Sequence, residues 1–485
     1  MGTTRAIRLI TFCRMGSRGF VVAGVVGALL CGGVATAAAD GGQERADIHV
    51  AQTLGDRELT VVIRRTDTVP GPLRVDVVTH AGDAPGRLGL RLVQQGRTTA
   101  SAPLDLGERP GPHGVTLRLE QTGPAELALD DGGRTALIPF VVPAIVLPVW
   151  QQVSYGGFVA AGVLLLVALV VAVRARRGWP ALVAGGGVVA AIAVGSTAAL
   201  LSATVPPPTP PGTVSDPLPD GSPDPWSPVP VDTSRPPVNL AVGAPGATAG
   251  APAEVTLSLA DGSTGRPADD LLVHHNALMH LVVVSPSGRM WHVHPVRVAP
   301  GEYAVRFTPS EPGRYGLAAE LARRGGGMQL VRGSFDVGGT AAEPAPAPGG
   351  LGPRTVGGQP VELTSTGAGA GAPTTFTARF GDRADLQPWL GMVGHLIVVG
   401  PLPESGLGAA AVAAPVWAHV HAMVPPTAGG VGGQPDETVA AYGPEVRFTY
   451  TFPAPGRYRL WFQAERDYGV LTVPAVLDVG EGQVR

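Results

Sequence analysis

One stretch decides how this chain is expected to fold, namely Met279-His-Leu-Val-Val-Val-Ser-Pro-Ser-Gly-Arg-Met-Trp-His-Val-His-Pro295. An apolar, β-branched run follows a first histidine, a turn sequence follows the run, and a His-Val-His triplet closes the stretch. Alternate side chains of a strand point to one face, so His292 and His294 are expected to project side by side. The stretch therefore predicts neighbouring strands that carry three imidazoles.

The same pattern returns later in the chain. Residues 270–286 align without a gap with residues 385–401, which pairs His280 with His395, and the triplet returns within Trp417-Ala-His-Val-His-Ala-Met423. A Pro-Gly-Arg-Tyr turn that leads into an alternating strand also occurs in both halves, as is typical of Greek-key sandwiches. We expect an internal repeat of two antiparallel, Ig-like β-sandwiches. Their predicted ranges are 238–338 and 360–481, with a linker at 339–359.

The repeated histidines form a candidate metal site in each sandwich. Neutral imidazole is a common ligand of copper, zinc and nickel, and thioether sulfur favours Cu(I). Met290 shares a strand face with the first triplet and Met423 with the second. Copper is the preferred ion, and the predicted ligands are His280, His292, His294, His395, His419, His421, Met290 and Met423.

Two alternatives stay open at the level of sequence. The histidines could instead pack in the sheets with backbone partners, while the methionines fill core gaps. An even-residue hairpin at 285–288 would turn His280 away from the triplet, whereas an odd loop or a bulge would bring them together. Asp270 and Asp385 could orient imidazoles or cap turns. His274 and His275 have no counterpart in the second repeat and lie outside the predicted site.

The first part of the chain predicts a membrane protein. Residues 1–39 read as a signal peptide, which contains both cysteines, and residues 40–147 show the short alternating segments of a third β-sandwich. Two apolar spans follow, at 155–173 and 181–203, which we expect to form a transmembrane hairpin. The Pro-rich residues 205–237 read as an extended linker.

Charge gives the expected topology and excludes some functions. The link between the two spans is short and basic, which places it in the cytoplasm and both large regions on the extracytoplasmic side of the cell membrane. The net charge of −3, without a basic block, gives no footprint for nucleic acid. The sequence contains no nucleophile elbow, phosphate-binding loop or His-Glu-x-x-His motif, so we expect no enzyme.

The second repeat resembles a family of secreted bacterial domains. The resemblance rests on Asp385-Leu-Gln-Pro-Trp-Leu-Gly391, Gly394-His395, His419-Val-His421 and Phe452-Pro-Ala-Pro-Gly-Arg-Tyr-Arg-Leu-Trp-Phe-Gln463, and it extends more loosely to the first repeat. It implies cupredoxin-like sandwiches with a role in extracytoplasmic copper or heavy-metal handling, and the triplet histidines with His280 and His395 as ligands. Such domains carry proline after the triplet. Pro295 keeps this feature and Ala422 does not, so the second site is expected to be altered.

Together these features predict a membrane-anchored protein that binds copper or another soft transition metal for storage, delivery or sensing. Its expected partners are the membrane, through two helices, and a metal-handling envelope protein. The alternative is a metal-free envelope module for protein or cell-surface contacts.

Overall fold

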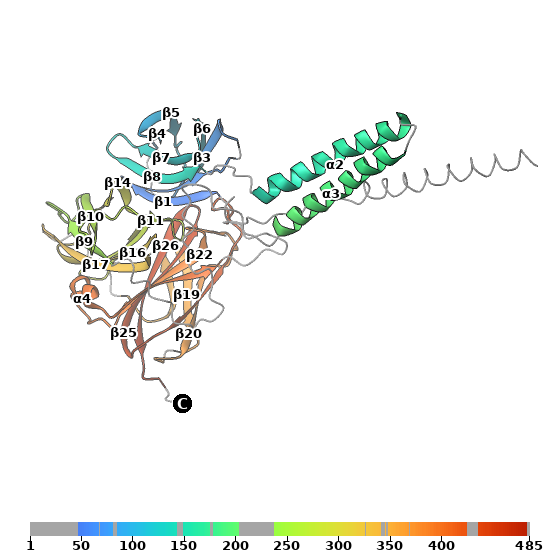
Figure 1. Cartoon of the computed structure of the whole chain (residues 1–485). Helices are drawn as coiled ribbons and strands as arrows, with labels where there is room; N and C mark the ends of the chain where they lie inside the picture. Colours follow the sequence, from blue (N-terminus) through green and yellow to red (C-terminus); the bar gives the residue numbers. More distant parts are fainter. Residues whose placement is uncertain are drawn as a thin grey trace, which may run out of the picture. The chain divides into compact units, whose positions relative to one another are not determined.

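The computed structural model (Figure 1) describes residues 47–66, 68–80, 85–142, 149–174, 178–202, 237–324, 326–340, 345, 348–367, 369–423 and 435–482. The predicted signal peptide, residues 175–177 of the basic link and the Pro-rich segment up to residue 236 lie outside these residues. The chain forms two compact units, one helical and one built of strands.

The helical unit consists of α2 (Val149–Arg174) and α3 (Trp179–Ser202). Both helices are long and apolar enough to cross a membrane, and they extend the predicted spans at their N-terminal ends. They pack antiparallel, because Gly157 lies against Gly195 and Leu164 lies against Gly187. A Cβ atom added to Gly157 would lie 2.8 Å from the Cα of Gly195, so the close contact requires glycine.

The strand unit begins with the N-terminal sandwich, whose two sheets are antiparallel. The first contains β1 (Ile48–Leu54), β2 (Arg57–Ile63), β3 (Gly71–Thr79) and β6 (Gly111–Leu119) in that order. The second has the order β5 (Arg97–Asp105), β4 (Arg87–Gln94), β7 (Gly123–Asp130) and β8 (Thr135–Val142). Alternate residues such as Leu88, Leu90 and Leu92 point into the shared core.

Repeat 1 is a second two-sheet sandwich. Its first sheet has the order β14 (Val296–Ala299), β15 (Glu302–Phe307), β10 (Ala253–Asp261) and β9 (Val238–Gly243). Its second sheet has the order β11 (Leu271–Leu272), β16 (Gly313–Arg323), β12 (Met279–Val284) and β13 (Met290–Val293), and β17 (Gly327–Val337) also pairs with β16.

Repeat 2 has the same arrangement. One sheet has the order β18 (Gly352–Val356), β19 (Gln359–Ser365), β20 (Pro373–Phe380) and β24 (Glu445–Thr451). The other has the order β21 (Leu386–Gln387), β25 (Gly456–Arg466), β22 (Met392–Gly400) and β23 (Val416–Met423), with β26 (Gly469–Val479) on β25. The Tyr315 and Tyr458 hydroxyls each donate to the carbonyl four residues earlier, at 2.9 Å, which is the tyrosine corner of Greek-key sandwiches.

Strand β18 lies inside the predicted linker. It forms a hairpin with β19 through Gly357 and Gly358, which have φ values of 56° and 76°. A Gly-Gly pair at positive φ is a favoured two-residue hairpin turn, and this signal places the start of the second sandwich before residue 360.

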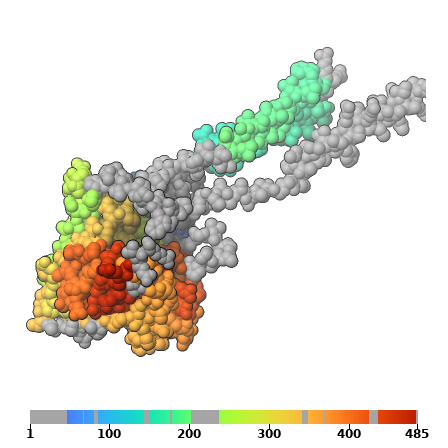
Figure 2. All heavy atoms as spheres, turned by 90° about the horizontal axis from the view of Figure 1, so that it is seen from below, coloured from blue at the N-terminus to red at the C-terminus, as the bar shows by residue number. Residues whose placement is uncertain are grey.

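The two repeats pack against each other through their histidine-bearing sheets. In β12, Leu281 and Val283 point into the core of repeat 1, while Val282 and Val284 join an apolar cluster with Ile397 and other residues of repeat 2. Figure 2 shows the yellow residues of repeat 1 directly against the orange residues of repeat 2. Both faces of β12 are therefore buried.

A short helix, α4 (Leu407–Ala413), lies in the connection between β22 and β23. It packs on β16, and the amide of Leu407 donates to the carbonyl of Pro286 at 3.0 Å. Its buried apolar residues Leu407 and Ala411 belong to the apolar cluster between the repeats, and their burial favours the helix there.

Candidate metal centre

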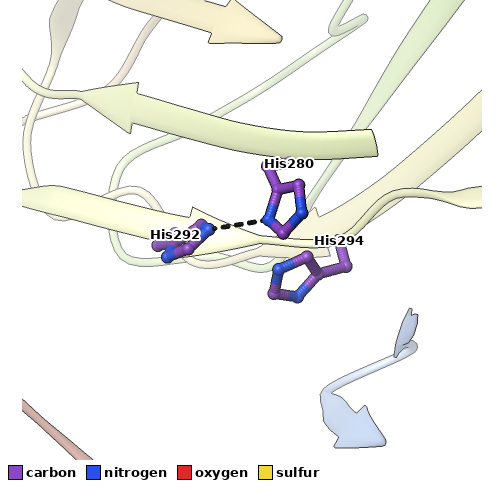
Figure 3. Close-up of side chains that lie close together, drawn as sticks. All are labelled: His280, His292 and His294. Carbon is purple, nitrogen blue, oxygen red and sulfur yellow. Dashed lines mark hydrogen bonds between the residues drawn. The ribbon is translucent and has the colours of Figure 1, made fainter. Parts of the chain in front are cut away.

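The histidines of repeat 1 converge on one face of its second sheet. The loop between Val284 and Met290 holds five residues, so Val282 lies opposite His292 and the odd loop sets the register. His280 is two residues before Val282 and therefore shares the face of His292 and His294 (Figure 3). Each of the three offers a nitrogen within 4.8 Å of the other two.

The histidines of repeat 2 converge in the same way. His395 lies directly opposite His421, and His419 lies opposite Ile397, two residues along the strand. A register shift between Met392 and Gly394 precedes the pairing. The three nitrogens again lie within 4.8 Å of one another.

The two sets face each other across the boundary between the repeats. The His292 ring centroid lies 4.8 Å from that of His419 and 5.7 Å from that of His395, and the His280 and His419 centroids are 5.1 Å apart. We expected one site in each sandwich. The structure instead joins all six imidazoles in a single cluster, which we call the histidine centre.

A tight turn fixes the lone histidine of each repeat. The Nε2 atom of His280 lies 3.1 Å from the carbonyl oxygen of His274, and that of His395 lies 3.0 Å from the carbonyl oxygen of Trp389. A carbonyl oxygen can only accept, so Nε2 carries the proton in both rings. A neutral imidazole has one N–H, and the Nδ1 atoms therefore present lone pairs to the centre.

The triplet histidines lie near polar groups of the opposite repeat. His292 donates from Nδ1 to Oε1 of Gln463 at 3.0 Å, and Gln463 is the strand partner of His395. His419 instead donates from Nε2 to Nδ1 of His395 at 2.9 Å. Its Nδ1 atom lies 3.6 Å from Oε2 of Glu320, the strand partner of His280, and has no hydrogen-bond partner. Gln463 thus orients His292 across the boundary between the repeats.

The N-terminal sandwich orients a third histidine. Glu58 accepts a hydrogen bond from Nδ1 of His294 at 2.6 Å and another from Thr53 at 2.6 Å. Thr53 also accepts from the amide of His294 at 2.8 Å. The buried Nε2 atom of His294 has no hydrogen-bond partner. A carboxylate behind an imidazole is the arrangement that holds a metal-ligating histidine in its tautomer.

Lone pairs meet at the middle of the repeat 1 set. The Nδ1 atom of His280 faces the Nε2 atom of His292 at 3.3 Å, along the dashed line of Figure 3. Both rings have their single proton on the far nitrogen, so two acceptors face each other in the neutral state. A proton or a cation between them relieves this contact.

Burial works against the proton. It lowers the pKa of the His280, His292, His395 and His419 side chains well below the ordinary value of 6.5, and neighbouring imidazoles lower it further. Burial also lowers the pKa of His421 to about 4. These five imidazoles are therefore neutral nitrogen donors at neutral pH, as metal binding requires.

A cavity of about 480 Å³ reaches the centre from the junction of the three sandwiches. Its wall includes Glu58 of the N-terminal sandwich, His292 of repeat 1, and Trp389 and Gln463 of repeat 2. The Trp389 ring packs against His292, with centroids 5.1 Å apart.

Four further residues considered from sequence lie away from the nitrogens. Met290 packs in the apolar cluster between the repeats, and Met423 is 68% exposed. Asp270 and Asp385 accept from Arg323 and Arg466 at 2.9 and 2.7 Å, so these carboxylates hold arginines and not imidazoles. The six predicted histidines are therefore the residues that the structure brings together.

Sequence reasoning missed the polar residues that lie beside the histidines of the centre. Glu58, Gln463 and Glu320 come from elements far from the histidines in the chain, and no local pattern marks them. One signal was available for the packing of the repeats. The runs after His280 and His395 are apolar without alternation, which indicates strands buried on both faces.

Comparison with known domains supports the repeat. Residues 234–337 and 354–481 each match a domain of unknown function, DUF8832. Among curated proteins, no match was found.

Solved structures give only distant similarity. The tetra-tandem repeat of a large adhesion protein has 8% identity and a TM-score of 0.16, over 90% of this chain and 74% of that chain. A Corynebacterium diphtheriae protein described as membrane-anchored has 8% identity and a TM-score of 0.16, over 88% and 90%. Two fibronectin type III domains of chicken tenascin have 12% identity and a TM-score of 0.14, over 50% and 99%. None of these matches supports the cupredoxin-like or copper-associated part of the expected resemblance.

Proposed function

We propose that the histidine centre binds a divalent first-row transition metal ion in a protein that α2 and α3 anchor to a membrane. The observation that carries the proposal is the contact between His280 Nδ1 and His292 Nε2, two lone pairs 3.3 Å apart inside the protein. A metal ion binds both lone pairs at once, and the Nε2 atom of His294 supplies a third nitrogen ligand.

The donor set also bears on the identity of the ion. Imidazole suits zinc, copper, nickel and iron, whereas Cu(I) prefers thioether and thiolate sulfur. The two candidate methionines are an apolar-cluster residue, Met290, and an exposed residue, Met423. Among divalent ions, Cu²⁺ binds nitrogen sites most tightly. We therefore propose Cu²⁺ as the ion that binds most tightly, with Zn²⁺ as a second candidate that suits an imidazole site.

The proposed setting is extracytoplasmic. The predicted signal peptide and the basic link between the two helices support a topology with the strand unit outside the cell membrane. In that setting a buried metal centre suits storage, delivery to a metal-handling envelope protein, or sensing.

The test is a metal titration of the detergent-solubilised full chain. We expect the wild-type protein to retain Cu²⁺ or Zn²⁺ through gel filtration, and a variant with His292, His294, His419 and His421 changed to asparagine to lose it. A matched control changes His49 and His113, which lie in the N-terminal sandwich away from the centre. Equal and weak retention by all three proteins would refute metal binding.

A metal-free contact module is the second candidate. The observation in its favour is that His280 and His395 are fully buried and bond to backbone carbonyls, as structural histidines do. Adhesion and membrane-anchored proteins among the distant similarities also fit this candidate better than copper handling. It predicts that chelators leave the thermal unfolding temperature unchanged, whereas the metal proposal predicts a lower one.

A further inference from the structure

The two repeats cover the histidine centre with different side chains. The turn that fixes His280 contains His274 and His275, and the equivalent turn before His395 contains Trp389 and Leu390. Both turns have the same hydrogen bonds, and His275 and Leu390 have positive φ values of 45° and 55°. The fold therefore does not require histidine at 274 or 275.

Each turn reaches over the triplet of the other repeat. Trp389 packs against His292 and His294, with centroids 5.1 and 5.8 Å apart, and closes that side with an apolar ring. On the other side, the His275 ring lies 4.2 Å from that of His421. One half of the centre thus has an apolar lid, and the other has a lid of further nitrogen donors.

These extra donors form a group of their own. His274, His275 and Glu320 each offer a ligand atom within 4.8 Å of the other two, and all three side chains are half-buried. The buried Nδ1 atom of His275 and the buried Nε2 atom of His421 have no hydrogen-bond partner. These two nitrogens are therefore free to bind a metal ion, and Glu320 supplies a carboxylate next to His275.

Glu320 joins this outer group to the centre. One carboxylate oxygen lies 4.0 Å from Nε2 of His274, and the other lies 3.6 Å from Nδ1 of His419. A cavity of about 20 Å³, large enough for one water or one ion, is lined by Glu320, His280 and His419. Burial increases along this line, from the half-buried outer group to the buried His280, His292 and His294.

We propose that His274, His275 and Glu320, together with His421, form a second metal position through which the ion enters the histidine centre. The position takes a partly hydrated divalent transition metal ion, with imidazole nitrogen and carboxylate oxygen as ligands. Glu320 then passes the ion inward, since its two oxygens face the two positions. This inference rests on the proposed function, because it needs an ion bound at the centre.

The experiment measures how fast the full chain loads, with aqueous Cu²⁺ as the probe. The metal-free protein in detergent is mixed with Cu²⁺ in a stopped-flow instrument, and the quenching of tryptophan fluorescence is followed, since Trp389 packs on the centre. The test variant is His274→Asn with His275→Asn, which removes two donors of the outer group. The control is His49→Asn with His113→Asn, two changes in the N-terminal sandwich.

We expect the test variant to load at least tenfold more slowly than the wild type and the control, and to retain the same amount of tightly bound Cu²⁺ after gel filtration. Loading at the wild-type rate, or complete loss of retained Cu²⁺, would overturn the proposal of an entrance. If the wild-type protein itself retains no Cu²⁺, the proposed function fails and the entrance fails with it. His275→Asn alone serves as a second variant, because asparagine accepts a positive φ and keeps the turn folded.

Discussion

At the scale of single residues, the centre depends on the group that accepts a hydrogen bond from the outer nitrogen of each imidazole. Glu58 accepts from the Nδ1 atom of His294 and so leaves its Nε2 atom free to bind. The carboxylate also fixes the tautomer and the orientation of the ring, which a ligating histidine needs.

Glu58→Gln is therefore expected to weaken the affinity for Cu²⁺ or Zn²⁺ about 10–100-fold, as the loss of a carboxylate behind a ligating histidine usually does. A competition titration with a chelator measures this on the full chain. The control is Glu108→Gln, an exposed glutamate of the same sandwich. An unchanged affinity in Glu58→Gln would contradict the role assigned to this carboxylate.

The sequence predicts the six histidines as candidate ligands, but not that both repeats contribute them to one centre. His280, His292 and His294 follow from strand alternation and a repeated motif, and the five-residue loop confirms that they share a face. Glu58 could not be predicted, because it comes from another sandwich and lies 236 residues from His294 in the chain. Contacts at that separation depend on how whole domains pack, which no local period encodes.

At the scale of elements, β12 and β22 explain why two separate sandwiches share one centre. Val282 and Val284 of β12 meet Ile397 and Val399 of β22 in the apolar cluster beside the histidines. Burying this apolar surface holds the two sheets together. The packing of the sheets therefore brings the two sets of imidazoles face to face.

Helix α4 tests this packing. A Cβ atom added at Gly408 would lie 2.2 Å from the carbonyl oxygen of Arg314, which the backbone of repeat 1 cannot avoid without moving. We expect Gly408→Ala to lower the free energy of unfolding by about 1–3 kcal/mol, as overpacking in a core does. Ala409→Val on the exposed face of the same helix is the control, and denaturant unfolding of the full chain gives both values. Equal stability of the Gly408 variant and wild type would count against a tight contact between the repeats.

At the scale of the whole molecule, the N-terminal sandwich also binds repeat 2. His80 at the end of β3 donates to Glu465 of β25, and its other ring nitrogen lies 3.1 Å from the hydroxyl of Thr60. The groups that face it are Glu465, Glu437 and Glu58. Although burial alone would lower it, these carboxylates raise the pKa of His80 to about 9.

This pair predicts a pH dependence of stability. The folded protein holds a proton on His80 up to about pH 9, whereas an unfolded histidine releases it near pH 6.5. The stabilisation is therefore complete below pH 6.5 and is lost as the pH rises to 9, about 3 kcal/mol in total. Denaturant unfolding across this range should show the fall in wild type and a flatter profile in His80→Gln. The same slope in both proteins would rule out His80 as its source.

The measurement that tests the central claim most directly is X-ray absorption spectroscopy of the Zn²⁺-loaded full chain. A shared histidine centre predicts at least three imidazole nitrogens at about 2.0 Å and no sulfur in the coordination shell. It also predicts that His292→Asn in repeat 1 and His419→Asn in repeat 2 each alter that shell. A shell of oxygen alone, or a spectrum that neither variant changes, would contradict the centre described here.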